Sequence, residues 1–103
     1  MNELQYQRKL MKKIQLLFPG ATVLKNDPSF MQGIPDILIL YKDRWAMLEV
    51  KIDGNANIRP NQEYYVKLFG EMSFASFISP ETEEDVLHDL QQSLGLIGKA
   101  RVS

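Results

Sequence analysis

The sequence predicts one α/β domain in which a mixed sheet is flanked by helices on both sides. Three observations support this fold class. Helix-like and strand-like segments follow one another in the order α-β-β-β-α-β-α. Two apolar segments in the middle of the chain are joined by a link that is short enough for a hairpin. The 103 residues suffice for one hydrophobic core and contain no repeat or internal linker, so residues 1–103 are expected to form a single domain.

The first helix is expected over residues 2–18, because apolar residues recur there at near-helical spacing. Its apolar stripe consists of Leu4, Met11, Ile14 and Phe18, widened by Leu10 and Leu17. Pro19-Gly20 ends this helix, and residues 21–24 then form a short strand before a turn.

Two stronger strands are expected in the centre of the chain. Residues 34–41 are nearly all apolar, which is typical of a strand buried on both faces, and Asp36 is their one charged residue. Residues 45–52 form the second strand. Because only residues 42–44 join them, the two strands are predicted to be antiparallel neighbours.

A polar loop over residues 53–57 leads to the second helix. Pro60 fits the first position of that helix, and Gly70 fits its C-terminal cap after Phe69. The remaining elements are a strand over residues 74–78 and a last helix that starts at Ser79-Pro80 and ends near Leu94, before Gly95.

The composition excludes several classes of protein. The absence of cysteine excludes disulfide scaffolds and cysteine zinc sites. A net charge of −1 excludes a polybasic surface along the whole chain. No apolar run reaches the roughly 18 residues of a membrane span, and the first residues are too polar for a signal peptide. An intracellular protein without membrane contact is therefore expected.

The charges are unevenly distributed along the chain. The first 25 residues carry a net charge of +4, from Arg8, Lys9, Lys12, Lys13 and Lys25 against Glu3. Residues 81–90 carry five acidic residues and no Lys or Arg. The net charge therefore leaves nucleic-acid binding through one side of the domain open.

Asp36 is an unusual residue for so apolar a strand, because an isolated buried charge costs several kcal/mol unless it is paired or bound to a metal. Glu49 and Lys51 lie two residues apart in the next strand, so their side chains share a face. If Asp36 lies on the same side, two carboxylates and one ammonium group converge.

Such a group of residues has a chemical use. Two carboxylates, with water and a backbone carbonyl, suit Mg²⁺ or Mn²⁺. A bound divalent ion polarises a phosphoryl oxygen and lowers the pKa of a bound water. A neighbouring lysine can orient or deprotonate that water, or stabilise the developing charge. The pattern indicates metal-assisted hydrolysis of a phosphodiester.

The segment Gly33-Ile34-Pro35-Asp36, followed after twelve further residues by Glu49-Val50-Lys51, resembles the PD-(D/E)xK nuclease signature. Over residues 2–80 the chain more narrowly resembles the VRR-NUC domains, in their short stand-alone form from phages and bacteria. The resemblance implies a restriction-endonuclease-like core, α-β-β-β-α-β, to which a C-terminal helix is added. It also implies a cytoplasmic location in a bacterial or phage-infected cell.

The resemblance implies roles for individual residues. Asp36 and Glu49 are implied as metal ligands, and Lys51 as the catalytic lysine. The further implied residues are Val50, through its carbonyl, as a third ligand, Gln62 as a catalytic residue that orients the site, and Glu3 as a glutamate of the first helix near the metal.

The expected function is that of a Mg²⁺- or Mn²⁺-dependent endonuclease that hydrolyses DNA. Relatives include homodimers that cut branched DNA such as Holliday junctions, so the resemblance implies structure-selective cleavage by a homodimer. The candidate DNA contacts are Lys9, Lys12 and Lys13 of the first helix, and Arg59, which stands where relatives often carry a Ser or Thr helix cap. The alternatives are a non-catalytic DNA-binding or assembly module and a metal-independent structural homodimer.

Each assigned residue also has a purely structural alternative. Asp36 could simply pair with Lys51, and Glu49 and Lys51 could form an exposed pair on an edge strand. Gln62 could be an ordinary residue of a helix start, and Glu3 a first-turn acid favoured by the helix dipole. The lysines of the first helix could form a solvated face.

Overall fold

The computed structural model describes residues 1–53 and 57–96. Within these ranges the elements follow the predicted order: α1 (Glu3–Leu17), β1 (Thr22–Lys25), β2 (Ile37–Tyr41), β3 (Arg44–Val50), α2 (Pro60–Met72), β4 (Phe74–Ile78) and α3 (Glu83–Ser93). Residues 54–56 of the expected polar loop and residues 97–103 of the expected domain lie outside the described residues.

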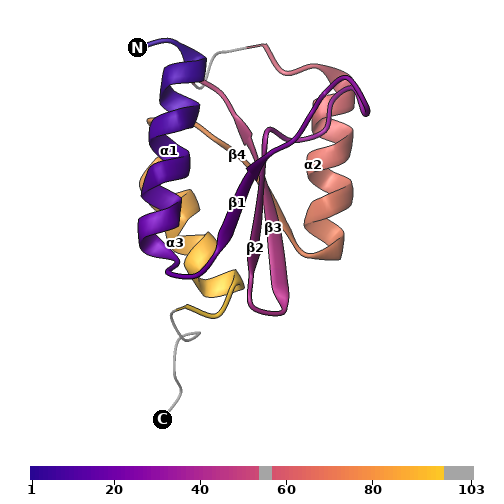
Figure 1. Cartoon of the computed structure of the whole chain (residues 1–103). Coiled ribbons are helices and arrows are strands. Elements are labelled where there is room, and N and C mark those ends of the chain that lie inside the picture. The colour runs from indigo at the N-terminus through magenta and orange to yellow at the C-terminus, as the bar shows by residue number, and fades with distance from the viewer. Residues whose placement is uncertain (54–56, 97–103) are drawn as a thin grey trace.

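The described strands form one mixed sheet in the order β1-β2-β3-β4. β2 pairs antiparallel with β1 and with β3, which confirms the predicted hairpin between β2 and β3. β4 pairs parallel with β3, because α2 carries the chain back along the sheet between them (Figure 1). β3 therefore lies in the interior of the sheet, with a neighbour on each side.

Helices cover both faces of the sheet, with α1 and α3 on one face and α2 on the other (Figure 1). The ring of Trp45 contacts Phe69 of α2 at a centroid distance of 6.1 Å, so strand alternation turns Trp45, Met47 and Glu49 toward α2. The residues between them turn toward α1 and α3. The core there contains Ala46, Leu48 and Val50 of β3, Ile37, Ile39 and Tyr41 of β2, and Leu10, Ile14 and Phe18.

Two faces predicted to be buried are partly open. Leu40 of β2 is 42% exposed, because α2 packs on β3 and β4 and leaves the same side of β2 uncovered. Leu4, expected in the apolar stripe of the first helix, is exposed too. Tyr6 takes its place in the core, since it lies four residues before Leu10 and therefore on the same helix face.

The ends of the two central strands differ from the prediction. β2 begins at Ile37 instead of residue 34, and β3 ends at Val50 instead of residue 52. Pro35 has no N–H for the ladder, and the following Asp36 directs its carboxylate to a main-chain N–H of the neighbouring strand. Asp36 and Lys51 therefore lie just outside the strands that were expected to contain them.

The prediction that Gly70 caps the second helix is wrong, because α2 continues to Met72. A Cβ at Gly70 would lie 3.6 Å from the carbonyl oxygen of Ala75, so this glycine lies where the helix passes close to β4. The last helix begins at Glu83 and not at Ser79-Pro80, because main-chain and side-chain hydrogen bonds between Ser79 and Thr82 first close a turn. None of the described helices combines the length and the apolarity that crossing a membrane requires.

Candidate active site

Asp36, Glu49 and Lys51 lie at the end of the sheet opposite the β2–β3 hairpin. Asp36 directly precedes β2, and Glu49 is the penultimate residue of β3. Because Ile37 pairs with Leu48 in the antiparallel ladder, Asp36 lies across from Glu49. Each carboxyl group is among the causes that shift the pKa of the other, so the two lie close together, which was the condition for a shared site.

Glu49 is buried on the α2 side of the sheet. Its exposed fraction is 3%, and it lies on β3, which has a neighbouring strand on either side. The alternative of an exposed pair on an edge strand is therefore wrong for Glu49 and Lys51.

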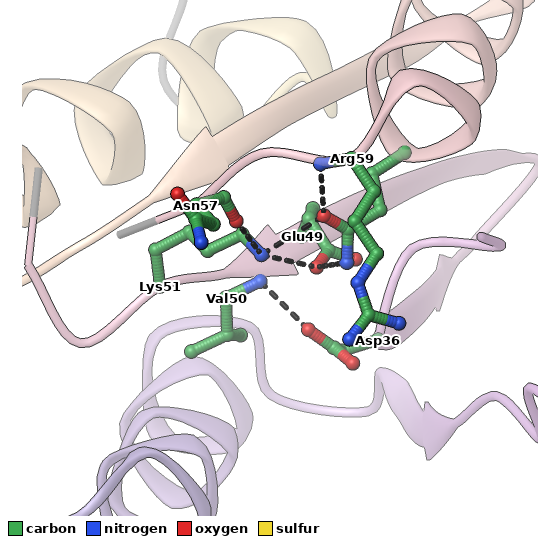
Figure 2. Close-up of polar contacts among 7 residues, drawn as sticks. Asp36, Glu49, Val50, Lys51, Asn57 and Arg59 are labelled. Atoms are coloured by element: carbon green, nitrogen blue, oxygen red, sulfur yellow. Dashed lines mark hydrogen bonds and ion pairs between the residues drawn. The ribbon is translucent and has the colours of Figure 1, made fainter. Parts of the chain in front are cut away.

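Asp36 is held from two neighbouring strands. Its carboxylate accepts a hydrogen bond from the main-chain N–H of Val50 at 2.8 Å (Figure 2). Asn26, directly after β1, donates its main-chain N–H to the Asp36 carbonyl at 2.8 Å. The side-chain amide of Asn26 donates to the carbonyl of Pro35 at 2.9 Å. Asp36 therefore has a fixed position that does not depend on a lysine partner.

Gln62 connects the lysine, the glutamate and the start of α2. Its Oε1 accepts hydrogen bonds from Lys51 Nζ at 2.9 Å and from the main-chain N–H of Arg59 at 3.0 Å. Its Nε2 donates to Glu49 Oε2 at 2.9 Å. Lys51 Nζ also donates to the Asn57 carbonyl at 3.0 Å and lies 3.6 Å from Glu49 Oε2. Gln62 thus satisfies the helix start and orients two charged residues at the same time.

The two carboxyl groups hold their protons more tightly than usual. Burial, followed by the charge of Asp36, raises the pKa of Glu49 from its ordinary 4.5 to about 8, although Lys51 opposes the shift. Burial also raises the pKa of Asp36 and outweighs the opposing effects of the Val50 N–H and Lys51. A positive charge placed between the two carboxylates would favour their ionised forms and lower both pKa values.

Asp36 and Glu49 both border a cavity of about 110 Å³. The other lining residues are Pro28, Gln32, Gly33, Ile34, Arg59, Asn61 and Gln62. The carboxylates are therefore reachable from outside, although the residues that carry them are largely buried.

The donor set fits a divalent cation with oxygen ligands, because two adjacent carboxylates supply hard oxygens and a doubly negative charge. In residues 1–53 and 57–96, no group of three or more His, Cys, Asp or Glu residues has a metal-binding arrangement. Ligands beyond Asp36 and Glu49 would be carbonyl, water or substrate oxygens. The Val50 carbonyl stays a prediction in that role.

Glu3 lies in the first turn of α1 with an exposed side chain. Its charge is among the causes that raise the pKa of Glu49, so the start of α1 lies toward the site. The alternative role of Glu3, a first-turn acid favoured by the helix dipole, requires the same position. The assignment of Glu3 as a metal ligand stays a prediction.

The predicted DNA contacts divide into two groups. Arg59 lines the cavity of the two carboxylates. Lys9 and Lys13 instead line another cavity of about 240 Å³, where Lys13 forms an ion pair with Glu83 of the acidic helix α3. Lys12 is exposed on α1. Because α1 and α3 cover the same face of the sheet, the basic and acidic segments lie side by side (Figure 1).

Sequence analysis missed Lys25 and Asn26 as residues of the site. Lys25 ends β1, and its positive charge partly opposes the rise in the pKa of Asp36 that burial causes. The sequence marks residues 26–29 as a turn, which is correct, but no local pattern shows that this turn supports Asp36. That role depends on the pairing of β1 with β2, which is a contact between distant parts of the chain.

Neither a protein-family profile nor a curated protein matches the sequence. Among solved structures, the chain is similar to one described as a "VRR_NUC domain protein", with a TM-score of 0.69 and 18% sequence identity. The similarity covers 93% of this chain and 90% of that chain. The chain therefore has the fold of a VRR_NUC domain, which is the α/β fold with a mixed, helix-flanked sheet that the sequence predicts.

Proposed function

We propose that this chain is an endonuclease that uses Mg²⁺ or Mn²⁺ to hydrolyse phosphodiester bonds of DNA. The observation that carries the proposal is the buried pair of Asp36 and Glu49 with Lys51 beside it, at a cavity open to solvent. Paired carboxylates with raised pKa values are typical of functional sites. The name of the similar solved structure supports a nuclease-like domain.

Asp36 and Glu49 would hold the ion, with the Val50 carbonyl as a third ligand and Glu3 as a further contributor from α1. When bound, the ion supplies positive charge to the phosphate and lowers the pKa of the attacking water. Because carboxylates bind metals in their ionised form, Glu49 would lose its proton when the site is filled.

Lys51 would stabilise the charge that develops on the phosphate. Its ammonium group has three N–H donors, of which Gln62 and Asn57 accept two. The ammonium group also lies 3.6 Å from Glu49 Oε2, and its remaining N–H would turn to a phosphate oxygen as the transition state forms. Gln62 keeps both Lys51 and Glu49 in position, so it would matter for the rate without contributing charge of its own.

The proposed substrate is branched DNA, such as a Holliday junction. Arg59 would contact phosphates at the cavity, and Lys9, Lys12 and Lys13 would contact phosphates along α1. Such contacts carry no sequence information, so selection by DNA shape fits them. A homodimer, in the cytoplasm of a bacterial or phage-infected cell, would place one active site at each of two strands.

A cleavage panel tests the proposal. Supercoiled plasmid, duplex, single-stranded, flap and four-way-junction DNA are each incubated with Mg²⁺, Mn²⁺ or EDTA. We expect cleavage with either metal, none with EDTA, and a loss of about 100-fold or more for Asp36→Ala. Asp43→Ala is the matched control, because Asp43 is an exposed aspartate in the hairpin at the far end of the sheet.

Two results would contradict the metal mechanism. The first is cleavage that survives EDTA, and the second is an Asp36→Ala protein as active as Asp43→Ala. Light scattering tests the homodimer separately, and the monomer mass of 11.9 kDa at micromolar concentration would contradict it.

A further inference from the structure

Phe30 lies in a loop that contributes residues to the wall of the carboxylate cavity, and 92% of its surface is exposed. Single exposed apolar side chains are common on proteins and have no meaning by themselves. Phe30 differs from such side chains because its loop lies at the cavity. Residues on both sides of Phe30 form part of the cavity wall.

The first half of this loop is held by Asp27. Its carboxylate accepts a hydrogen bond from the main-chain N–H of Ser29 at 2.9 Å. Its carbonyl accepts one from the N–H of Phe30 at 3.3 Å. These bonds fix the backbone that leads to the phenylalanine.

The second half of the loop is anchored to α2. Asn61 Nδ2 donates to the carbonyl of Gln32 at 3.1 Å. Gly33 has a φ of +94°, and a Cβ there would lie 2.7 Å from Asn61 Cγ, so the close contact needs a glycine. Because both halves of the loop are held, the backbone that carries Phe30 has a fixed position.

The distance from the cavity matches the spacing of nucleotides. Pro28 and Gln32 line the cavity, and each lies two residues from Phe30. Two residues span at most about 7 Å, whereas a stacked DNA strand rises about 3.4 Å per nucleotide along the helix axis and an unstacked strand is more extended. A base next to a phosphate in the cavity is therefore within reach of the ring.

We propose that Phe30 stacks on an unpaired base next to the phosphate bound at the carboxylate cavity, and so selects DNA that has unstacked bases at a flap, gap or branch point. The inference rests on the proposed function and names a residue that selects its substrate. In a continuous duplex every base is stacked between neighbours, so a side chain gains a base face only by unstacking them. In a single-stranded segment the face is open to an aromatic ring. Arg59 lines the cavity and the charge of Lys25 acts on Asp36, so both supply positive charge near the cavity for the DNA backbone.

The test compares Phe30→Ala and Phe30→Trp with Leu16→Ala, which removes an 82% exposed apolar side chain from α1. Binding is measured in Ca²⁺ with a flap and a blunt duplex of the same sequence, and 2-aminopurine marks the unpaired base in the flap. We expect Phe30→Ala to bind the flap about tenfold more weakly, to bind the duplex as the parent does, and to lose the fluorescence quenching. Phe30→Trp should retain both properties, and Leu16→Ala should behave as the parent.

Three results would overturn the inference. Phe30→Ala could bind the flap as the parent does, or lose affinity equally for the flap and the duplex. It could also change its oligomeric mass while keeping the parent's preference for the flap. The last would place Phe30 in a contact between two copies of the chain. The two proposals fail separately. A parent protein that binds the flap through Phe30 but cuts nothing overturns only the nuclease function. Asp36-dependent cleavage with unaltered selectivity in Phe30→Ala overturns only the role of Phe30.

Discussion

The side chain of Asn26 reaches the carbonyl of Pro35 at 2.9 Å, one residue before the carboxylate that is proposed to bind the metal. Asp36 lies outside β2, so the regular ladder of the sheet does not hold it alone. The main-chain N–H of Asn26 adds a second bond, to the Asp36 carbonyl itself. Asn26 therefore positions Asp36 without touching the cavity of the carboxylates.

The variant Asn26→Ala should lower cleavage by about tenfold or more, because a displaced ligand misplaces the reacting groups. Gln15→Ala is the matched control, since Gln15 makes the same kind of bond, to the Ala21 carbonyl, near the start of β1. Both variants should lose about 1 kcal/mol of unfolding free energy. The measurements are kcat, Mn²⁺ affinity and urea unfolding. Equal losses of activity in the two variants would reassign Asn26 to stability alone.

Two substitutions at Gln62 separate its contacts. Gln62→Ala removes the bonds to Lys51 and Glu49 and should lower kcat by about tenfold or more. Gln62→Glu keeps an acceptor for Lys51 but places a second carboxylate against Glu49, so it should raise the pKa of Glu49 further. The pH–rate profile of Gln62→Glu should therefore shift to higher pH. A parental profile and rate in both variants would leave Gln62 as a helix cap only.

Stability without metal should fall as the pH rises from about 5.5 to about 8.5. In the unfolded chain Glu49 loses its proton near 4.5, whereas the raised pKa in the folded chain is about 8. Between these values the folded state binds more protons than the unfolded state, so each rise in pH lowers the free energy of unfolding. Urea unfolding across this range should show that the free energy of unfolding depends less on pH in Glu49→Gln than in the parent. Identical slopes would show that Glu49 titrates normally.

Metal binding should oppose this loss of stability. Mn²⁺ competes with the proton on Glu49, so the rise in melting temperature on adding Mn²⁺ should be larger near pH 8.5 than near pH 5.5. At a free concentration of about 100 times Kd, the gain is about 2.7 kcal/mol. Asp36→Ala should lose the effect and Asp43→Ala should keep it. A rise that Asp36→Ala retains would place the ion elsewhere.

The salt dependence of DNA binding should identify the cations that touch phosphates. Arg59→Ala should reduce the slope of log K against log salt by about 0.9, the value for one phosphate contact. Replacing Lys9, Lys12 and Lys13 by alanine should reduce it further if α1 follows the backbone. Because Lys13 also pairs with Glu83, the unfolding free energy of this variant must be measured beside its binding. An unchanged slope would assign the three lysines to solvent.

The convergence of the two carboxylates could be predicted because it follows from local rules. The link between the central strands allows only an antiparallel hairpin, and the spacing in that hairpin brings Asp36 opposite Glu49. The two-residue period of a strand places Lys51 on the face of Glu49. These rules need no knowledge of the rest of the fold.

The features that the sequence did not reveal depend on contacts between distant segments. Gly70 has the residue type of a helix cap, yet its close approach to β4 at Ala75 keeps it inside α2. Asn26 and Asn61 look like ordinary turn and helix residues until β1 and α2 bring them against residues 32–36. The pairing of Lys13 with Glu83 likewise joins segments 70 residues apart.

The turn at Lys42 and Asp43 lies at the end of the sheet away from every residue of the candidate site (Figure 1). Exposed turns of this kind accept inserted sequence more readily than strands do. A fluorophore or a whole guest domain inserted between Lys42 and Asp43 would leave the ends of β2 and β3 that carry Asp36 and Glu49 paired as before. The turn is therefore the place at which a DNA-targeting module can be built into the chain, with both termini left as they are.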